Sequence, residues 1–151
     1  MKIDNINKKI LFLLQKDARI TYKEIASELN RSETTIRDRI KAMERVGIIQ
    51  GYTALIDKTA LGLNFFAIIL GNPDSTSELD KITDKIKKVK NVLRVYQISG
   101  NKRLAIFLVS PSYKELKEII QTQLISIGLK DEEIITVLEA DSEFILPIEI
   151  P

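Results

Sequence analysis

Residues 21–47 read TYKEIASELNRSETTIRDRIKAMERVG and contain two helix starts in close succession. At the first, Thr21 and Glu24 have the spacing of a capping box, in which a hydroxyl and a carboxylate each accept a hydrogen bond from an otherwise unpaired backbone amide. At the second, Ser32 is a preferred N-cap residue, and Glu33 places negative charge in the first turn, where the helix dipole favours it. The pattern predicts two short helices joined by a tight turn.

Apolar residues recur at helical spacing around these starts. Upstream, Ile6, Ile10 and Leu14 predict a core-facing helix that ends near Asp17. The apolar lines of the two following helices comprise Tyr22, Ile25, Ala26 and Leu29 in one and Ile36, Ile40 and Met43 in the other. Gly47 stands where a helix can end in a left-handed residue. Two short helices supported by a preceding one predict a helix-turn-helix.

The third helix has a face whose composition suits DNA. On a wheel of about 100° per residue, Thr34, Lys41 and Arg45 fall opposite the apolar line, and Arg37 and Asp38 flank them. Lys and Arg offset phosphate charge, whereas hydroxyls and the first residues of such a helix reach base edges in the major groove. The residues predicted to contact DNA are Arg31, Ser32, Thr34, Thr35, Arg37, Asp38, Arg39, Lys41 and Arg45.

Two features of this helix admit other readings. Arg39 lies beside the apolar line, which predicts that its stem packs against the protein while its guanidinium reaches towards a phosphate. Glu33, Asp38 and Glu44 are interleaved among the cations, so the polar face is also compatible with plain solvated surface. The close spacing of two capped helices favours DNA contact.

The remaining residues predict a second domain of strands and helices. The β-branched stretch 48–56 predicts a strand or wing, and 57–63 predicts a linker because Asp57 and Gly62 are turn residues. Beyond the linker the predicted order is strand (65–70), helix (77–89), strand (92–99), strand (104–110), helix (113–125) and strand (134–145), with an irregular tail in 146–151. This βαββαβ order is two split βαβ units, the ferredoxin-like arrangement.

The predicted fold class is therefore α+β. We expect a helix-turn-helix domain in residues 1–56, a linker in 57–63 and a ferredoxin-like oligomerisation or effector domain in 64–151. Its helices cover one face of an antiparallel sheet. The strand Phe65–Leu70 is apolar throughout, so we expect the other face to pack on another subunit.

The composition lowers the expectation of an enzyme. The chain has no Cys and no His, which removes thiolate metal ligands and the side chain best suited to proton transfer near pH 7. We therefore expect no catalytic residue, metal or cofactor. Residues 1–62 carry 12 Lys and Arg against 8 Asp and Glu, whereas the remainder carries 11 against 13, so a polyanion is expected to meet the N-terminal part.

The apolar run Ile10–Leu14 is too short for a signal peptide or a bilayer span. A soluble cytoplasmic protein with no membrane partner is therefore expected. The lysine-rich stretch 81–90 predicts an exposed helix face rather than a second nucleic-acid patch, because acidic residues dilute it.

The N-terminal residues resemble the Lrp/AsnC transcription regulators, also called feast/famine regulatory proteins. The shared motifs are Asp4-x-x-x-Lys8-Lys9-Ile10-x-x-x-Leu14-Gln15-Lys16-Asp17-Ala18-Arg19, Glu24-Ile25-Ala26, Ser32-Glu33-x-Thr35-Ile36-x-x-Arg39-Ile40-x-x-Met43-Glu44-x-x-Gly47-Ile48-Ile49-x-Gly51-Tyr52 and Leu61-Gly62. The resemblance implies a winged helix-turn-helix linked to a ligand-sensing, dimer-forming sheet domain. It also implies assembly of dimers into tetramers or octamers, double-stranded DNA as partner, and amino acids as the usual effectors.

The family's effector loop follows the second strand of the sheet domain and commonly reads Gly-x-x-Asp. The corresponding residues here are Gly100, Asn101, Lys102 and Arg103. Arg103 in place of Asp reverses a charge, so this loop would repel the ammonium of an amino acid and favour a carboxylate. The later Gly-Val-x-x-Thr-x-Thr stretch of the family reads GLKDEEI in residues 128–134, without both hydroxyls. The sequence therefore leaves open whether a small-molecule effector binds here, and it disfavours an ordinary amino acid. The alternative is that 100–103 is a plain hairpin connection.

Two other classes of function compete with the regulator hypothesis. Ferredoxin-like domains also occur in enzymes and in small-molecule-binding regulatory subunits, although the sequence contains no glycine-rich phosphate loop, nucleophile and base pair or metal-ligand cluster. Alternatively, the helix-turn-helix contacts protein or RNA. The salt dependence of duplex binding separates these hypotheses from DNA recognition.

Overall fold

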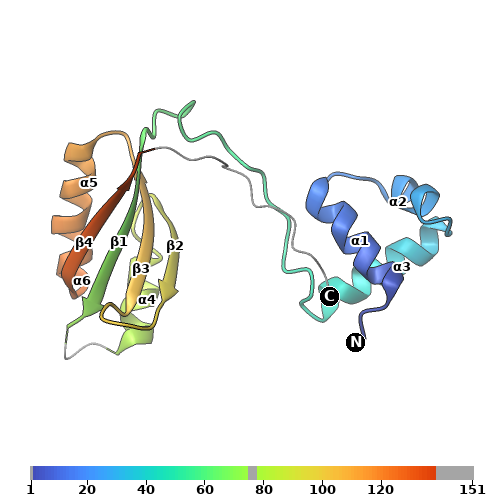
Figure 1. Ribbon diagram of the computed structural model, residues 1–151, viewed down its shortest axis with the longest axis horizontal. Helices are drawn as coiled ribbons and strands as arrows, with labels where there is room; N and C mark the ends of the chain where they lie inside the picture. Colours follow the sequence, from blue (N-terminus) through green and yellow to red (C-terminus); the bar gives the residue numbers. More distant parts are fainter. Residues whose placement is uncertain (1, 75–77, 139–151) are drawn as a thin grey trace. The chain divides into compact units, whose positions relative to one another are not determined.

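The computed structural model describes residues 2–74 and 78–138. The chain divides into two units, and the division between the first and the second falls between Leu55 and Ile56. Figure 1 shows a helical unit followed by a unit built on a sheet.

Three helices form the first unit: α1 (Asn5–Lys16), α2 (Tyr22–Glu28) and α3 (Glu33–Arg45). Each begins at a side-chain cap. The Asp4 carboxylate accepts from the Asn7 amide at 2.8 Å. Thr21 and Glu24 form the predicted capping box, and Ser32 caps α3. These caps satisfy backbone donors that a helix start leaves unpaired, so the predicted helix-turn-helix starts are confirmed.

The apolar lines of the three helices meet in one core. Ile10 of α1, Ile25 of α2, and Ile36, Ile40 and Met43 of α3 are fully buried there. Residue 47 is a glycine with φ +74°, and it ends α3 in the left-handed conformation that the sequence predicts.

Residues 48–56 are predicted to form a strand or wing, and the prediction of a strand is wrong. The described structure gives this segment no strand, and its backbone runs without a regular element after Gln50. β-branched residues favour an extended chain, but a strand exists only where a second extended segment pairs with it.

The described residues of the second unit form four strands, and the helices that come between them in the sequence cover one face of the sheet (Figure 1). In chain order they are β1 (Phe65–Pro73), α4 (Leu79–Ile86), β2 (Val92–Gln97), β3 (Leu104–Ser110), α5 (Tyr113–Ile119), the π-helical turn η1 (Ile120–Leu124), α6 (Ile125–Ile127) and β4 (Leu129–Val137). The strands pair antiparallel in the order β2-β3-β1-β4. This confirms the predicted ferredoxin-like βαββαβ domain.

Element boundaries differ from the prediction: β1 extends to Pro73 instead of 70, α4 ends at Ile86 instead of 89, and β2 ends at Gln97 instead of 99. The helix expected over 113–125 continues through a π-helical turn to Ile127, and Gly128 ends it with φ +113°. β4 begins at Leu129, before the predicted start at Ile134, although Asp131–Glu133 is acidic. β4 is an edge strand that pairs only with β1, and an edge tolerates charged side chains. The end of the predicted strand to 145, and the tail 146–151, lie outside the described residues.

The core of this unit lies between the sheet and its helices. Ile69 of β1 and Ile106 of β3 pack with Ile82 of α4 and Leu116 of α5. Gly71 of β1 lies at a register shift against β4, and a Cβ there would meet Leu129 Cδ1 at 2.6 Å.

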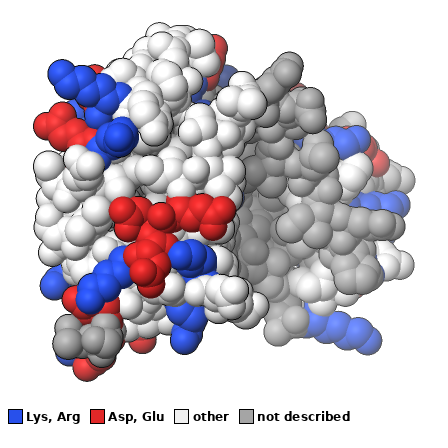
Figure 2. Space-filling model, turned by 60° about the vertical axis from the view of Figure 1, so that its left-hand side comes forward, with Lys and Arg blue, Asp and Glu red and all other residues white. Residues whose placement is uncertain are grey.

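The opposite face of the sheet carries apolar and aromatic side chains. Phe107 of β3 lies between Phe66, with ring centroids 6.1 Å apart, and Tyr96, with centroids 5.6 Å apart and rings nearly perpendicular. Tyr96 and Ile135 stay exposed. Figure 2 shows one side of the molecule, on which uncharged surface is broad and charged side chains are grouped.

Within residues 2–74 and 78–138, no helix is long and apolar enough to cross a bilayer. The same residues contain no group of three or more carboxylates able to hold a metal ion.

Replacing Gly71 with Ala should destabilise the sheet unit by about 1–3 kcal/mol, because the new methyl group overpacks against Leu129 and the Lys130 carbonyl oxygen. Urea denaturation of the full chain, followed by circular dichroism, measures the change in free energy of unfolding. Glu132→Ala, on the exposed edge strand, is the control. Equal stability of Gly71→Ala and wild type would contradict the close packing of β1 on β4.

Candidate nucleic-acid interface

The face of α3 opposite its buried line carries Thr34, Asp38, Lys41 and Arg45, and all four are exposed. In the part of the chain that the structure describes, their side chains form no hydrogen bond or ion pair with the protein. Two cations, a hydroxyl and a carboxylate are thus available on one outward face. These groups can meet phosphates and base edges together.

Arg37 lies at one flank of this face and is engaged within the protein. Its Nη2 donates to Glu33 Oε1 at 2.6 Å, one helical turn away. Its guanidinium also lies over the ring of Tyr22 in α2, with Cζ 5.6 Å from the ring centroid. Arg37 therefore links α3 to α2, and a contact to DNA would draw on a guanidinium that already has partners.

Arg39 lies at the other flank and links α3 to α1. Its Nη1 donates to Asp4 Oδ2 at 2.7 Å and to Asn7 Oδ1 at 2.9 Å. Asn7 is only 2% exposed, so this arginine satisfies a buried polar group. The prediction that the Arg39 stem lies beside the apolar line agrees with this position. Its guanidinium, however, points to the start of α1, and we interpret it as a positioning group for α3.

The sequence prediction missed Asp4 and Asn7 as partners of Arg39. One signal was present: Asn7 is a polar residue next to Ile6 on the helix surface that faces the core. A buried polar side chain requires a hydrogen-bonding partner.

The predicted residues at the start of α3 are occupied by local bonds. The Ser32 and Thr35 hydroxyls lie 2.7 Å apart, and the Thr35 amide donates to Ser32 Oγ. Arg31 Nη1 donates to the carbonyl of Asn30, whose φ is +53°. These three residues stay exposed or half-buried at the helix N-terminus, and their contact with DNA stays a prediction.

The predicted effector residues Gly100–Arg103 lie together in the turn between β2 and β3. The Arg103 amide donates to Asn72 Oδ1 at 3.0 Å, and Asn72 Nδ2 donates to the Asn101 carbonyl at 3.1 Å. Lys102 Nζ donates to the Asp131 carbonyl. The turn is thus tied to β1 and β4, with the Arg103 side chain exposed. Effector binding there stays a prediction.

The ionisation of Asp4 makes the stability of the helical unit depend on pH. The Asn7 amide and the Arg39 guanidinium hold the pKa of the Asp4 carboxyl below its ordinary value of 3.8. A lowered folded pKa adds stability above pH 3.8, and that stability is lost as the pH falls through this value and below. Asp4→Asn keeps a good N-cap residue but removes the charge that Arg39 meets.

We therefore expect Asp4→Asn to have a lower Tm of the helical unit than wild type at pH 6. The difference in Tm between the two proteins should become smaller as the pH falls to 3, because the wild-type carboxylate is then protonated. Differential scanning calorimetry measures both. Asp38→Asn, on the outward face of α3, is the control and should follow wild type. A constant difference at every pH would contradict a role for the ionised carboxylate.

Comparison with known proteins agrees with this arrangement. Residues 3–50 match the family model described as winged helix-turn-helix DNA-binding. The chain is 35% identical to the HTH-type transcriptional regulator LrpA of Pyrococcus horikoshii over 122 residues, which cover 81% of this chain and 86% of that protein. It is 32% identical to the regulatory protein AsnC of Haemophilus influenzae over 125 residues, 81% of each chain.

A solved structure has the same fold over the whole length. The structure of E. coli AsnC superposes with a TM-score of 0.87 at 24% identity, covering 99% of this chain and 100% of that one. The relatives above are named as regulators, not as enzymes. This chain, with a helix-turn-helix ahead of a ferredoxin-like sheet, belongs to the Lrp/AsnC family of DNA-binding transcription regulators.

Proposed function

We propose that this regulator binds dyad-symmetric operator DNA as a dimer or a multiple of it, with α3 in the major groove. The observation that carries the proposal is the outward face of α3, where Lys41 and Arg45 have no partner among the described residues. Buried apolar residues on the opposite side hold this face outward.

The residues of the face have different roles in this proposal. Lys41 and Arg45 neutralise phosphates or donate to guanine, and Thr34 is near the helix start, where base edges are reached. Asp38 can accept from the amino group of cytosine. Arg37 holds the angle of α3 through its contact with Tyr22 of α2, and Arg39 holds it through Asp4 at the start of α1.

The proposed dimer uses the open sheet face. Phe107, Phe66 and Tyr96 form an aromatic cluster there, and Ile135 adds exposed apolar surface. Such a patch is typical of a self-associating surface. Two-fold symmetry of the protein then implies half-sites about 10 base pairs, or a multiple of that, apart.

We propose further that an effector held at Gly100–Arg103 carries an anionic group. A transcriptional regulator of Neisseria meningitidis, solved as a complex with L-Met, has a similar fold, with 22% identity and a TM-score of 0.89 over 97% of each chain. The exposed Arg103 guanidinium repels an ammonium and attracts a carboxylate or phosphate. The turn that presents Arg103 is braced by Asn72.

Operator binding tests the interface. Fragments of genomic DNA recovered with the protein at physiological salt define the operator. On it, Lys41→Ala and Arg45→Ala should each weaken binding, and for a phosphate contact each should reduce the slope of log K against log salt by about 0.9. Arg37→Ala should reduce the slope less, because its guanidinium already pairs with Glu33.

Lys130→Ala, in the sheet unit, is the control for the loss of one positive charge. Fluorescence anisotropy of a labelled operator measures all four variants. Unchanged affinity of both Lys41→Ala and Arg45→Ala would show that another surface contacts DNA.

The dimer is tested separately. Phe107→Asp places a charge in the aromatic cluster and should weaken self-association by at least about 2 kcal/mol. Sedimentation equilibrium should then report monomer at concentrations where wild type is dimeric. Gln121→Asp, on the exposed side of the helical layer, should leave the mass unchanged. A folded Phe107→Asp variant with the wild-type mass would place the interface elsewhere.

A further inference from the structure

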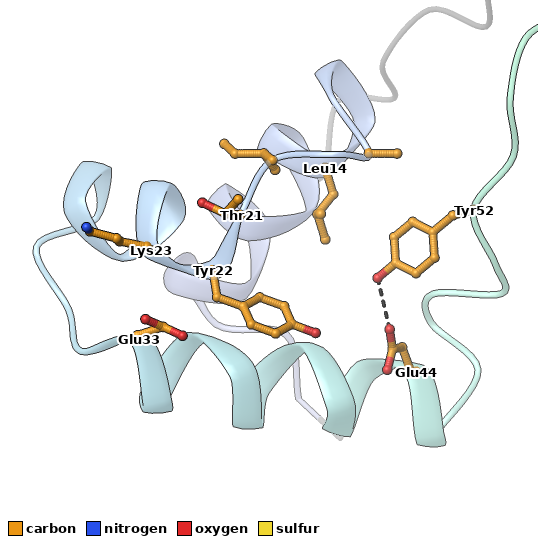
Figure 3. Close-up of a pocket in the computed structure, with 9 residues that line it drawn as sticks. Leu14, Thr21, Tyr22, Lys23, Glu33, Glu44 and Tyr52 are labelled. Atoms are coloured by element: carbon orange, nitrogen blue, oxygen red, sulfur yellow. Dashed lines mark hydrogen bonds between the residues drawn. The ribbon is translucent and has the colours of Figure 1, made fainter.

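The helical unit contains a pocket of about 450 Å³ that is open to solvent on one side. It lies between the end of α1, the start of α2, the side of α3 and the segment that follows α3 (Figure 3). Its volume is within the range of small-molecule sites in proteins, roughly 300–1,000 Å³. All residues that line the pocket belong to the first unit, whereas residues 100–103 belong to the second.

One end of the pocket is acidic and aromatic. Tyr52 donates its hydroxyl hydrogen to Glu44 Oε1 at 2.9 Å, and Tyr22 extends over α3 towards the same space (Figure 3). In the part of the chain that the structure describes, no Lys or Arg forms an ion pair with Glu44. Partial burial, with the Glu44 carboxylate beside it, raises the pKa of Tyr52 to about 12. The phenol thus stays protonated and is the donor in its hydrogen bond to Glu44.

The rest of the pocket is apolar on one side and carries charged groups at its far end. Leu14, Ala18 and Ile20 supply aliphatic lining, next to the Thr21 hydroxyl. At the far end Glu33 is paired with Arg37. Lys23, whose ammonium would repel a cation, also lies at this end, away from Glu44 (Figure 3). The carboxylate without a cationic partner is therefore the one flanked by the two tyrosines.

We propose that this pocket binds an organic ammonium ion with an apolar body. The cation lies against the Tyr22 and Tyr52 rings and next to the Glu44 carboxylate. Aromatic faces attract cations, and the attraction is strongest where water is partly excluded. The apolar body lies on the aliphatic lining, and a neutral or anionic ligand of the same shape lacks the charge interaction with Glu44.

A consequence for DNA follows and rests on the proposed function. Glu44 is next to Arg45 in α3, and Arg37 stacks on Tyr22, so an occupant touches the helix that carries the DNA-facing residues. A ligand that binds the DNA-competent and free forms unequally shifts operator affinity by that difference. The response would arise without any ligand in the sheet unit.

Tyrosine resonances report binding directly. The chain has four tyrosines, of which Tyr22 and Tyr52 lie in the pocket and Tyr96 and Tyr113 lie in the sheet unit. Benzyltrimethylammonium chloride is titrated into the full chain with ring-labelled tyrosine and followed by NMR. The Tyr22 and Tyr52 signals should shift saturably while those of Tyr96 and Tyr113 stay in place. Benzyl alcohol and benzoate, without a cation, should bind more weakly.

Variants identify the groups that hold the cation. Glu44→Gln keeps an acceptor for Tyr52 and should weaken binding of the probe about tenfold, since it removes the charge. Tyr52→Leu removes one ring and should weaken binding in the same direction. Glu28→Gln, on the exposed surface of α2, is the matched control. Circular dichroism confirms that each variant is folded.

No saturable shift of Tyr22 or Tyr52, equal affinity of Glu44→Gln and wild type, or equal binding of benzyl alcohol would each overturn the site. Operator binding is measured separately with and without the probe. Tyrosine shifts with unchanged operator affinity would support the site and overturn its coupling to DNA. Failure of wild-type protein to bind any operator would overturn the proposed function while leaving the NMR result in force.

Discussion

The burial of one apolar line of α3 is the constraint on which the DNA-facing surface depends. Ile36, Ile40 and Met43 are enclosed with Ile10 and Ile25, so α3 has a single rotation about its axis. If the whole apolar line were shifted by one position in the sequence, the buried face would turn by about 100° and charged groups would be buried. The orientation of the cations is therefore set by residues that never reach DNA, through the exclusion of apolar surface from water.

Two arginines reinforce that rotation from opposite sides. Arg37 ties α3 to α2 through Tyr22, and Arg39 ties it to α1 through Asp4 and the buried Asn7. The hydrogen bond from Arg39 to Asp4 is charge-assisted and directional, so it restrains angle as well as distance. A helix rich in cations thus uses some of them for its own placement. Counting positive residues in a recognition helix overstates the contacts that remain for phosphates.

In the sheet unit, the position of a strand in the sheet determines which side chains it carries. The helices cover one face of the sheet, and β1 and β3 are paired with a strand on each side. β4 lies at the edge and carries the acidic run 131–133. Phe66, Phe107 and Tyr96 form an aromatic cluster on the face that the helices do not cover. Membership of the Lrp/AsnC family and this aromatic face support self-association. The helical unit, in turn, has its own pocket beside Glu44.

The sequence by itself determined the helix starts at Thr21 and Ser32, the apolar lines, the βαββαβ order and the DNA-binding class. These depend on side chains a few residues apart, whose spacing is readable along the chain. Only the tertiary structure decided that Arg39 meets Asp4, that Tyr52 meets Glu44, and where the strands begin and end. Residues 48–56 have the composition of a strand but form none, for the same reason. A strand or an ion pair requires a partner from elsewhere in the chain, and local sequence does not specify which segment that partner comes from.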